Sequence, residues 1–469
     1  MDKRTADLGT APIGRLLVRL SIPGVIGMVV MSLYNIIDTL WVSGLENGME
    51  AIAALTVLFP LQMVSGALGM GAGAGVGSLV ARRFGERRLE EVNRIAGNAV
   101  TLPIVMGVGT ATICLAFPES LALLFGGSRE LVPLAVIYLT TVAFGFPFLM
   151  LTMTLNGLYR GAGNTLMPMC IMGASAAVNA TLDPFLIYGW GPFPALGLQG
   201  AALATLTAQL VGCLVSMVYL LSRRSGYRIA GRDLRLRLPI LRDIAQVGAP
   251  AFASACTRSV VGSVFNWVLA GFGPAAVAAQ GLSLRVMRLV ISLLGPGVYQ
   301  GLLPIVGFNF GAKDYRRMWR AYRTAATWLS GMGFALSSVM LVFAPQVLAP
   351  FARDPELARL AVWALRLKIS TIFLVEPQMM AVGTFEGMGM GLRAMVLTLT
   401  RNVVLVVPAL LVLTHYFGVE GAFAAQPLGD VLSLAVAGTL LWRAYRAYPP
   451  SASAPKPLED AAATAATTE

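Results

Sequence analysis

Two acidic residues lie within long apolar stretches of the sequence. Asp38 lies in the stretch 16–43, and Asp183 lies in the stretch 168–190, four residues after Asn179. An ionisable side chain within a bilayer costs at least ~2.5–3.5 kcal/mol on insertion scales, so each one needs a physical reason. Residues four apart lie on one face of a helix, so we expect Asn179 and Asp183 to share a face.

The chemistry open to these carboxylates is cation binding. Burial in a medium of low dielectric constant favours the protonated carboxyl group, which suits it to take up and release a proton near neutral pH. Two carboxylates with neighbouring amide and hydroxyl oxygens are equally suited to sodium, for which Asp38, Asn179 and Asp183 are the candidates. The structural alternative is that the two acids cap a helix break or pair with an arginine within the membrane.

The second half of the chain carries a different set of charged residues within apolar stretches: Arg258, Arg285, Arg288, Glu376 and Arg401. An arginine–glutamate pair within the membrane is the conservative interpretation. The sharper hypothesis is that Arg258, Arg285, Glu376 and Arg401 contact a substrate in a central cavity.

Other reactive side chains give no sign of catalysis or of a metal centre. His415, the only histidine, lies at the end of an apolar stretch and has no second histidine or cysteine nearby. Cys114, Cys170, Cys213 and Cys256 lie far apart within apolar stretches, without the spacing of a metal site or a disulfide framework. We therefore expect no enzyme, no catalytic residue and no cofactor.

A glycine-rich run extends from Ser65 to Ser78 within an apolar stretch. A phosphate-binding loop would belong to a βαβ unit, and no such unit is predicted around this run. Gly69, Gly73 and Gly77 are four apart, the pattern of small residues that lets helices approach closely. We interpret the run as a helix-packing surface.

The elements that must position these residues are membrane-spanning helices. Of the 469 residues 57% are hydrophobic and only 12% are charged, and the mean hydropathy is +0.73. So few charges cannot cover a water-facing surface, since soluble domains average roughly 25% charged residues. An all-α membrane protein with twelve spans is predicted, at residues 16–43, 51–80, 95–117, 131–155, 168–190, 200–222, 243–270, 275–308, 324–348, 357–385, 394–416 and 419–442.

The basic residues test this count, because they are distributed unequally between the two sides. With alternate loops assigned to opposite sides, 26 of the 35 lysines and arginines fall on one side, and three (Arg129, Arg353 and Arg359) fall on the other. The positive-inside rule then places both termini in the cytoplasm of a multi-pass plasma-membrane protein. The net charge of +12 is explained by topology, so no nucleic-acid partner is expected.

The chain also repeats itself with an offset near 226 residues. Residues 84–87 (FGER) recur as 310–313 (FGAK), and residues 157–163 recur in pattern as 383–389. At this offset Asp38 and Asp183 have apolar counterparts. Two six-helix bundles around a cavity form a transporter architecture, which we favour over a channel or a polytopic membrane enzyme.

The predicted divisions are a cytoplasmic N-terminal segment (1–14), an N-lobe with spans 1–6 (15–222), a basic cytoplasmic linker (223–242), a C-lobe with spans 7–12 (243–445) and a disordered cytoplasmic tail (446–469).

Several segments together resemble the multidrug and toxic compound extrusion (MATE) family, prokaryotic type. The similarity extends over about residues 15–445. The matching segments are Ser21–Pro23, Leu33–Asp38, Phe59–Gln62, Arg83–Gly85, Gly161–Asn164, Asn179–Pro184, Gly200–Thr205, Pro304–Lys313, Gly418–Gly421 and Gln426–Pro427.

This resemblance implies secondary active efflux, in which small organic molecules (drug-like compounds or metabolites) are exchanged for protons or sodium ions. It implies two six-helix lobes, a monomer, contact with membrane lipid, and H⁺ or Na⁺ as coupling ion. The residues that match the family's cation-coupling site are Asp38, Tyr138, Asn156, Asn179, Asp183 and Thr205.

The chain departs from some relatives in spans 7 and 8. Some members of the family have additional acidic residues in spans 7 and 8, whereas this chain has Arg258, Arg285 and Arg288 in these spans. The departure argues against a second cation site in the C-lobe and weakens the expectation of a cationic substrate. A flippase for lipid-linked precursors, of the same superfamily, is the alternative function.

Overall fold

The computed structural model describes residues 3–45, 48–125, 129–351 and 354–453, and every regular element in these ranges is helical. The first half contains α1 (Lys3–Thr10), α2 (Ile13–Ser43), α3 (Gly48–Gly85), α4 (Leu89–Ala116), α5 (Pro118–Leu124), α6 (Val132–Ala143), α7 (Phe146–Gly161), α8 (Leu166–Tyr188) and α9 (Leu198–Leu221). The second half contains α10 (Leu238–Ala270), α11 (Pro274–Gly311), α12 (Tyr315–Leu348), α13 (Pro355–Ile369), α14 (Ile372–Gly387), α15 (Gly391–Leu399), a π-helical turn η3 (Thr400–Leu405) and α16 (Val406–Ala447). Short 3₁₀ turns lie at Arg223–Ser225, Gly231–Leu234 and Pro450–Ala452.

These helices form the twelve predicted spans. By length and apolarity alone, seven segments of the described chain qualify, or eight if the bent pair α6–α7 is one span. One of the seven, Gly391–Ala452, contains two spans, because Gly418 has non-helical angles (φ 59°, ψ −141°) and Arg401 pairs with Asp430 across that turn. With α10, α11 and the broken pair α13–α14 the total is twelve.

Two spans predicted as continuous helices are in fact broken. α6 and α7 meet at 51°, and Pro147 follows the break, where its ring disfavours a helical conformation in the preceding residue. The second break lies at Ser370–Thr371, between α13 and α14. The breaks at Gly145 and Thr371 are 226 positions apart, which is the offset of the sequence repeat.

The predicted divisions differ from the helix bounds in two places. α10 begins at Leu238, so the end of the segment 223–242 is helical and not part of a loop. The predicted tail 446–469 begins within α16 and continues through the turn at Pro450–Ala452. Residues 454–469 lie outside the described residues.

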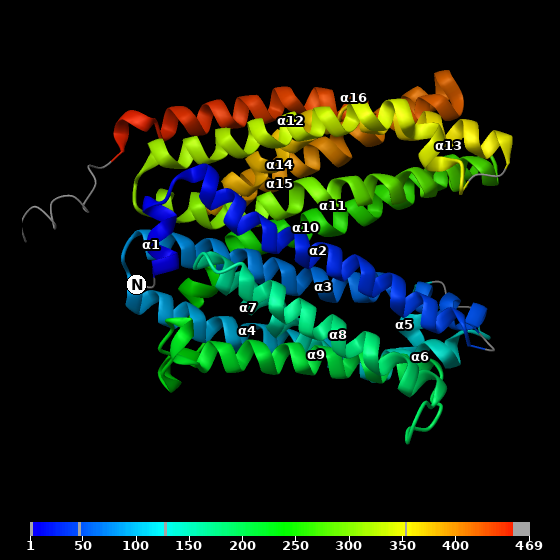
Figure 1. The fold of residues 1–469 in the computed structure, drawn as a ribbon, viewed down its shortest axis with the longest axis horizontal. Helices are drawn as coiled ribbons and strands as arrows, with labels where there is room; N and C mark the ends of the chain where they lie inside the picture. The colour runs from blue at the N-terminus through cyan, green and yellow to red at the C-terminus, as the bar shows by residue number, and fades with distance from the viewer. Residues whose placement is uncertain (1–2, 46–47, 126–128, 352–353, 454–469) are drawn as a thin grey trace, which may run out of the picture.

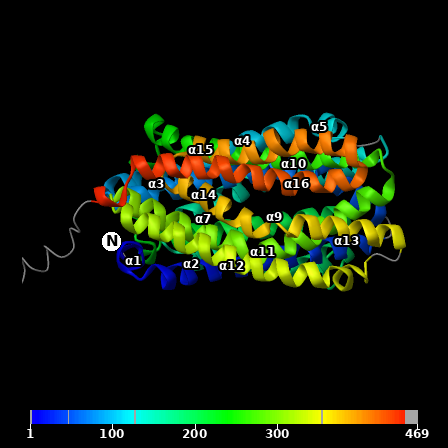
Figure 2. The ribbon, with the colours of Figure 1, turned by 90° about the horizontal axis from the view of Figure 1, so that it is seen from above.

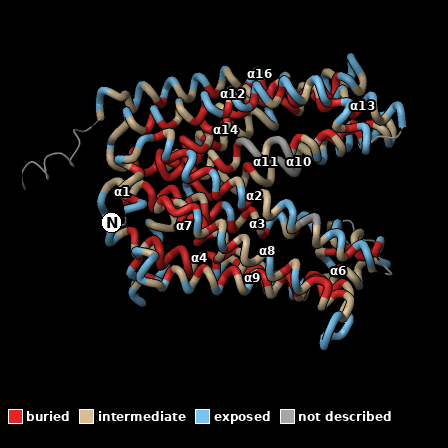
Figure 3. The backbone as a smooth tube through the Cα atoms, in the orientation of Figure 1, coloured by how far each residue is buried: buried red, intermediate tan, exposed pale blue. Residues whose placement is uncertain are grey.

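The helices gather into two bundles, an N-terminal bundle (α2–α9) and a C-terminal bundle (α10–α16) (Figures 1 and 2). One hydrophobic core contains residues of both bundles, among them Leu16, Val76, Ile305 and Phe385. Two further cores each stay within one bundle, one between residues 42 and 202 and one between residues 265 and 425. The bundles are therefore joined at the end that carries α1 and diverge toward the end that carries α5, α6 and α13 (Figure 3).

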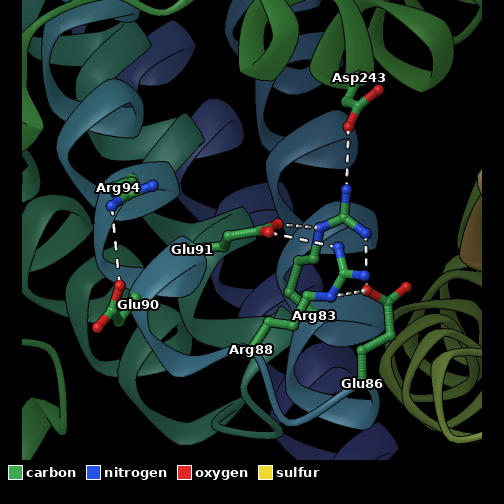
Figure 4. Close-up of polar contacts among 7 residues, drawn as sticks. All are labelled: Arg83, Glu86, Arg88, Glu90, Glu91, Arg94 and Asp243. Atoms are coloured by element: carbon green, nitrogen blue, oxygen red, sulfur yellow. Dashed lines mark hydrogen bonds and ion pairs between the residues drawn. The ribbon is translucent and has the colours of Figure 1, made fainter.

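Backbone contacts and ion pairs hold the joined end together. A Cβ atom added at Gly85 would lie 2.0 Å from the carbonyl oxygen of Phe308, so the ends of α3 and α11 touch through their backbones. Beside this contact, Arg83 binds Asp243 of α10 at 3.3 Å and so links the two bundles. The same guanidinium also binds Glu86 and Glu91, within a network that includes Arg88, and a separate pair joins Arg94 to Glu90 (Figure 4).

The glycine-rich run packs α3 against α7, as predicted. A Cβ atom added at Gly157 would lie 2.0 Å from the carbonyl oxygen of Gly73, and one at Gly77 would lie 2.8 Å from that of Gly157. Gly69 faces the backbone of Met150 in the same way. The three glycines thus let two helices approach to backbone contact, which is how association is favoured where lipid supplies little hydrophobic driving force.

A buried ion pair organises the C-terminal bundle. Arg401 Nε lies 2.7 Å from Asp430 Oδ1, and Thr371 at the break donates from its hydroxyl to Asp430 Oδ2 at 3.0 Å. Gln378 Nε2 donates to the Asp430 carbonyl at 2.9 Å. Asp430 thereby ties the break between α13 and α14 to the π-helical turn and to α16.

The α3–α7 contact predicts a strong effect at Gly157. Gly157→Ala inserts a methyl group against the Gly73 backbone, and we expect a loss of ~1–3 kcal/mol or more, the usual range for overpacking. Gly109→Ala is the matched control, because no atom lies within 4 Å of its added Cβ. Thermal unfolding in detergent measures both, and equal midpoints would contradict the contact.

The buried ion pair predicts a second, larger effect. Asp430→Asn leaves the Arg401 charge unpaired, which should cost ~3–5 kcal/mol of stability, and Arg401→Gln in the same chain should restore part of it. Glu420→Gln removes the exposed partner of Arg359 and should cost only ~0–1 kcal/mol. Additive losses in the double variant would show that the pair does not act as a unit.

Candidate functional site

All six residues predicted to couple a cation belong to the N-terminal bundle. Asn179 and Asp183 lie on α8 and are fully buried, and Asp38 of α2 is partly buried. Tyr138 of α6, Asn156 of α7 and Thr205 of α9 are also buried. α8 packs between α2 and α9, so its inward face brings the amide and the carboxylate toward both neighbours.

Asn179 orients Asp183 through a hydrogen bond within one helical turn. With the amide assigned the orientation that satisfies both of its groups, the Asn179 nitrogen donates to Asp183 Oδ2 at 2.9 Å and its oxygen accepts from the Thr205 backbone N–H at 3.2 Å. The other carboxylate oxygen, Oδ1, is buried and has no hydrogen-bond partner among the described residues. Asp183 therefore keeps one oxygen available to a cation or a proton.

Two tyrosines, Tyr34 and Tyr138, lie near the two carboxylates and near the Thr205 hydroxyl. Asp38 lies near enough for its charge to act on both tyrosines and on Asp183. Asp38, Tyr138, Asn179, Asp183 and Thr205 are thus brought into one group, which we call the acidic cluster.

Asn156 contributes to a space beside the acidic cluster. With Tyr34, Thr205 and Gln209 it lines a cavity of about 110 Å³. The side-chain oxygens of Asn156 and Gln209 are buried and have no hydrogen-bond partner among the described residues. Thr205 belongs to both places and Tyr34 lies beside it, so the cavity adjoins the acidic cluster.

Two contributors were missed at the sequence level. Tyr34 stands four residues before Asp38, so the helical spacing that relates Asn179 to Asp183 would have found it. Gln62 of α3 donates to the Tyr138 hydroxyl at 3.3 Å. An amide within an otherwise apolar stretch was the available signal.

The donor atoms limit the chemistry of the acidic cluster. They are carboxylate, amide, hydroxyl and phenol oxygens, which suit a proton or a hard cation such as sodium. Within the described residues, no three histidine, cysteine, aspartate or glutamate side chains come together to hold a metal ion. The donor set of the acidic cluster therefore suits a cation, and among its described residues no pair is arranged for nucleophilic catalysis.

The predicted substrate contacts are more dispersed. The Arg258 side chain lies outside the described residues, and Arg285 is exposed on α11. Glu376 of α14 is fully buried against Gly295, with neither carboxylate oxygen hydrogen-bonded to a described residue, and Arg401 pairs with Asp430.

Two buried charged residues of the C-terminal bundle were also not predicted from the sequence. One is Asp430, described above, and the other is Lys368, whose ammonium group donates to Gln280 and to Ser283. Both lie within predicted spans, so a complete scan for charged residues in those stretches would have found them.

Comparison with known proteins agrees with this architecture. The model of the MatE family matches residues 23–185 and 250–411, two blocks whose starts and ends are 227 and 226 positions apart. The chain is similar to the FAD transporter of Shewanella oneidensis (28% identity, 90% of this chain and 93% of the relative). It is also similar to the multidrug export protein MepA of Staphylococcus haemolyticus (25% identity, 90% of this chain and 91% of the relative).

A solved structure supports the same assignment. The outward-facing conformation of a multidrug resistance MATE family transporter of the MOP superfamily is 29% identical, with a TM-score of 0.87 over 96% of this chain and 99% of that chain. The family match extends over well over half of the sequence, in two blocks that reproduce the internal repeat. The chain therefore belongs to the MATE family: it is a multi-pass membrane protein and an efflux transporter, not an enzyme, and it needs no cofactor.

Proposed function

We propose that the chain exports small organic molecules in exchange for protons or sodium ions, with the cation bound at the acidic cluster. The observation that carries this proposal is the placement of Asp38 and Asp183 together within one of two bundles that are joined at a single end. A cation bound within one bundle can change the relative orientation of the two bundles without occupying the path of the substrate.

The residues of the acidic cluster, together with Asn156 beside it, take three kinds of role in this proposal. Asp38, partly buried, is the coupling acid, and Asp183 is its partner, oriented by Asn179. Tyr138, Asn156 and Thr205 supply further oxygens. A sodium ion would take ligands from Asp38, Asn179 and Asp183, whereas a proton would be shared between the two carboxylates.

The orientation of the protein in the membrane follows from the basic residues. Arg82, Arg83, Arg88 and Arg94 lie at the joined end, on the side that the charge asymmetry assigns to the cytoplasm. We therefore place both termini inside the cell and the diverging end outside, in the plasma membrane. The conformation described here is then the one that releases substrate.

The proposal extends to the substrate's charge. The Shewanella relative is named as a transporter of FAD, a molecule with anionic phosphates. In this chain Arg285 is exposed on α11, whereas Arg401 already pairs with Asp430 and Glu376 is buried. We therefore propose that the substrate range includes organic anions and that Arg285 is the cationic contact.

Replacing the coupling acid should abolish exchange. Asp38→Asn preserves size and hydrogen bonding but cannot cycle between charged and neutral forms, so ion-driven export from proteoliposomes should fall to background at normal protein levels. Glu376→Gln, which neutralises a buried carboxylate of the other bundle, should keep its coupling. Export by Asp38→Asn, or uncoupling by Glu376→Gln, would remove the acidic cluster from the mechanism.

Cation and substrate should weaken each other's binding. Antiport requires that the two ligands favour different states, and such linkage is reciprocal, typically ~1–3 kcal/mol or about 5–150-fold in affinity. Calorimetry of substrate binding in buffers of different ionisation enthalpy should show proton release, or a loss of affinity as sodium rises. Binding that is indifferent to both cations would favour a uniporter or a flippase.

A further inference from the structure

We propose that a pocket at the diverging end of the C-terminal bundle binds an anionic phospholipid. The pocket has a volume of about 510 Å³ and lies far from the acidic cluster, between the end of α12, the start of α13 and the part of α16 that follows Gly418. Its lining combines apolar side chains with three charged ones: Arg359, Arg366 and Glu420. We call it the outer pocket.

One face of α13 presents a cationic and aromatic stripe to the outer pocket. Arg359, Trp363 and Arg366 are spaced four and three residues apart, so they lie along one helix face. Arg359 is exposed, Trp363 is 43% exposed and Arg366 is half-buried. Tryptophan and arginine in this arrangement are typical of the membrane–water interface, where both keep a polar group near the headgroups.

The charges in the outer pocket leave a cation without a counter-ion. Arg359 Nη1 lies 3.6 Å from Glu420 Oε1, and both side chains are largely exposed, so this pair is weak. Arg366 donates from Nε to the Leu341 carbonyl at 3.0 Å and makes no ion pair with any described residue. Its terminal nitrogens therefore remain available, and a guanidinium binds phosphate oxygens in bidentate fashion.

The surroundings identify the phosphate as that of a lipid. Pro345, Leu348 and Leu360 line the pocket. Below it the outer surface of α12 is apolar, with Val339, Val342 and Phe343 each about half exposed or more. The acyl chains of a phospholipid would cover this surface while its headgroup reaches the guanidinium groups of Arg359 and Arg366. A free phosphate would leave the apolar lining of the pocket uncovered.

The sequence gives an independent reason for an anion at this place. Arg359 is one of only three basic residues on the side that the charge asymmetry leaves poor in cations, and Arg366 lies within a span, where a charge needs a partner. With two guanidinium groups against one carboxylate the pocket has a net positive charge. We therefore expect it to prefer an anionic headgroup over a zwitterionic one.

Thermal unfolding of the purified full-length chain in detergent tests this proposal, with phosphatidylglycerol and phosphatidylcholine added separately. Phosphatidylglycerol should raise the unfolding temperature more, and both Arg366→Gln and Arg359→Gln should weaken its apparent affinity at least ~10-fold, as expected for lost charge-assisted hydrogen bonds. Glu420→Gln should keep or strengthen the preference. Arg129→Gln is the matched control, an exposed arginine outside the pocket.

Three outcomes would overturn the proposal. The first is an unchanged preference for phosphatidylglycerol in Arg366→Gln and Arg359→Gln. The second is a rise in unfolding temperature with soluble glycerol phosphate equal to that with the lipid, which would indicate a site for a free anion. The third is loss of the preference in Arg129→Gln. If Arg366→Gln does not fold, because its Nε supports the Leu341 carbonyl, then Arg359→Gln and Glu420→Gln decide through their opposite signs.

Discussion

Backbone contact between helices at the joined end is the constraint on which the rest of the molecule depends. Glycines bring α3 against both α7 and α11, closely enough that an added Cβ atom would meet a carbonyl oxygen at about 2 Å. Lipid supplies little hydrophobic force between helices, so close packing must do this work: the α3–α7 contact holds the N-terminal bundle, and the α3–α11 contact, reinforced by the Arg83–Asp243 ion pair, holds the two bundles together. Beyond this end each bundle has its own core, and the two can diverge as separate bodies.

The repeat makes the two bundles similar in scaffold and different in their polar interiors. At the offset of 226, Thr152 and Ser175, which line the N-terminal cavity, correspond to Gln378 and Arg401 of the C-terminal bundle. There the larger side chains, with Asp430, form a satisfied buried network. The N-terminal bundle instead has a cavity beside two neighbouring carboxylates, and oxygens of Asn156, Asp183 and Gln209 lack partners among the described residues, whereas Glu376 of the C-terminal bundle is a lone carboxylate without a described partner. Two carboxylates that share a site repel each other, so this bundle is the one whose free energy an incoming cation can change most.

Much of the architecture could be predicted from residue patterns, because lipid imposes simple rules. Long apolar stretches predicted the twelve spans, the offset matches predicted the two bundles, and glycines at four-residue spacing predicted a helix-packing surface, which the structure places between α3 and α7. The breaks near Gly145 and Thr371 were missed, because hydropathy measures the length of an apolar stretch and not its straightness. A scan for charged residues would have found Asp430 itself, but not its network, since its partners Thr371 and Arg401 are distant in sequence and only tertiary packing joins them.

We propose that a cation at the acidic cluster controls how far the two bundles diverge. Double electron–electron resonance between spin labels at Leu124 and Phe351 tests this proposal directly. Both sites are exposed at the diverging end, and each belongs to a different bundle. The four native cysteines would first be replaced. We expect the distribution of distances between the two labels to change with pH or with sodium concentration. In Asp38→Asn the same distribution should stay fixed under all of these conditions. A distribution that ignores both cations, or one that responds equally in Asp38→Asn, would contradict the claim.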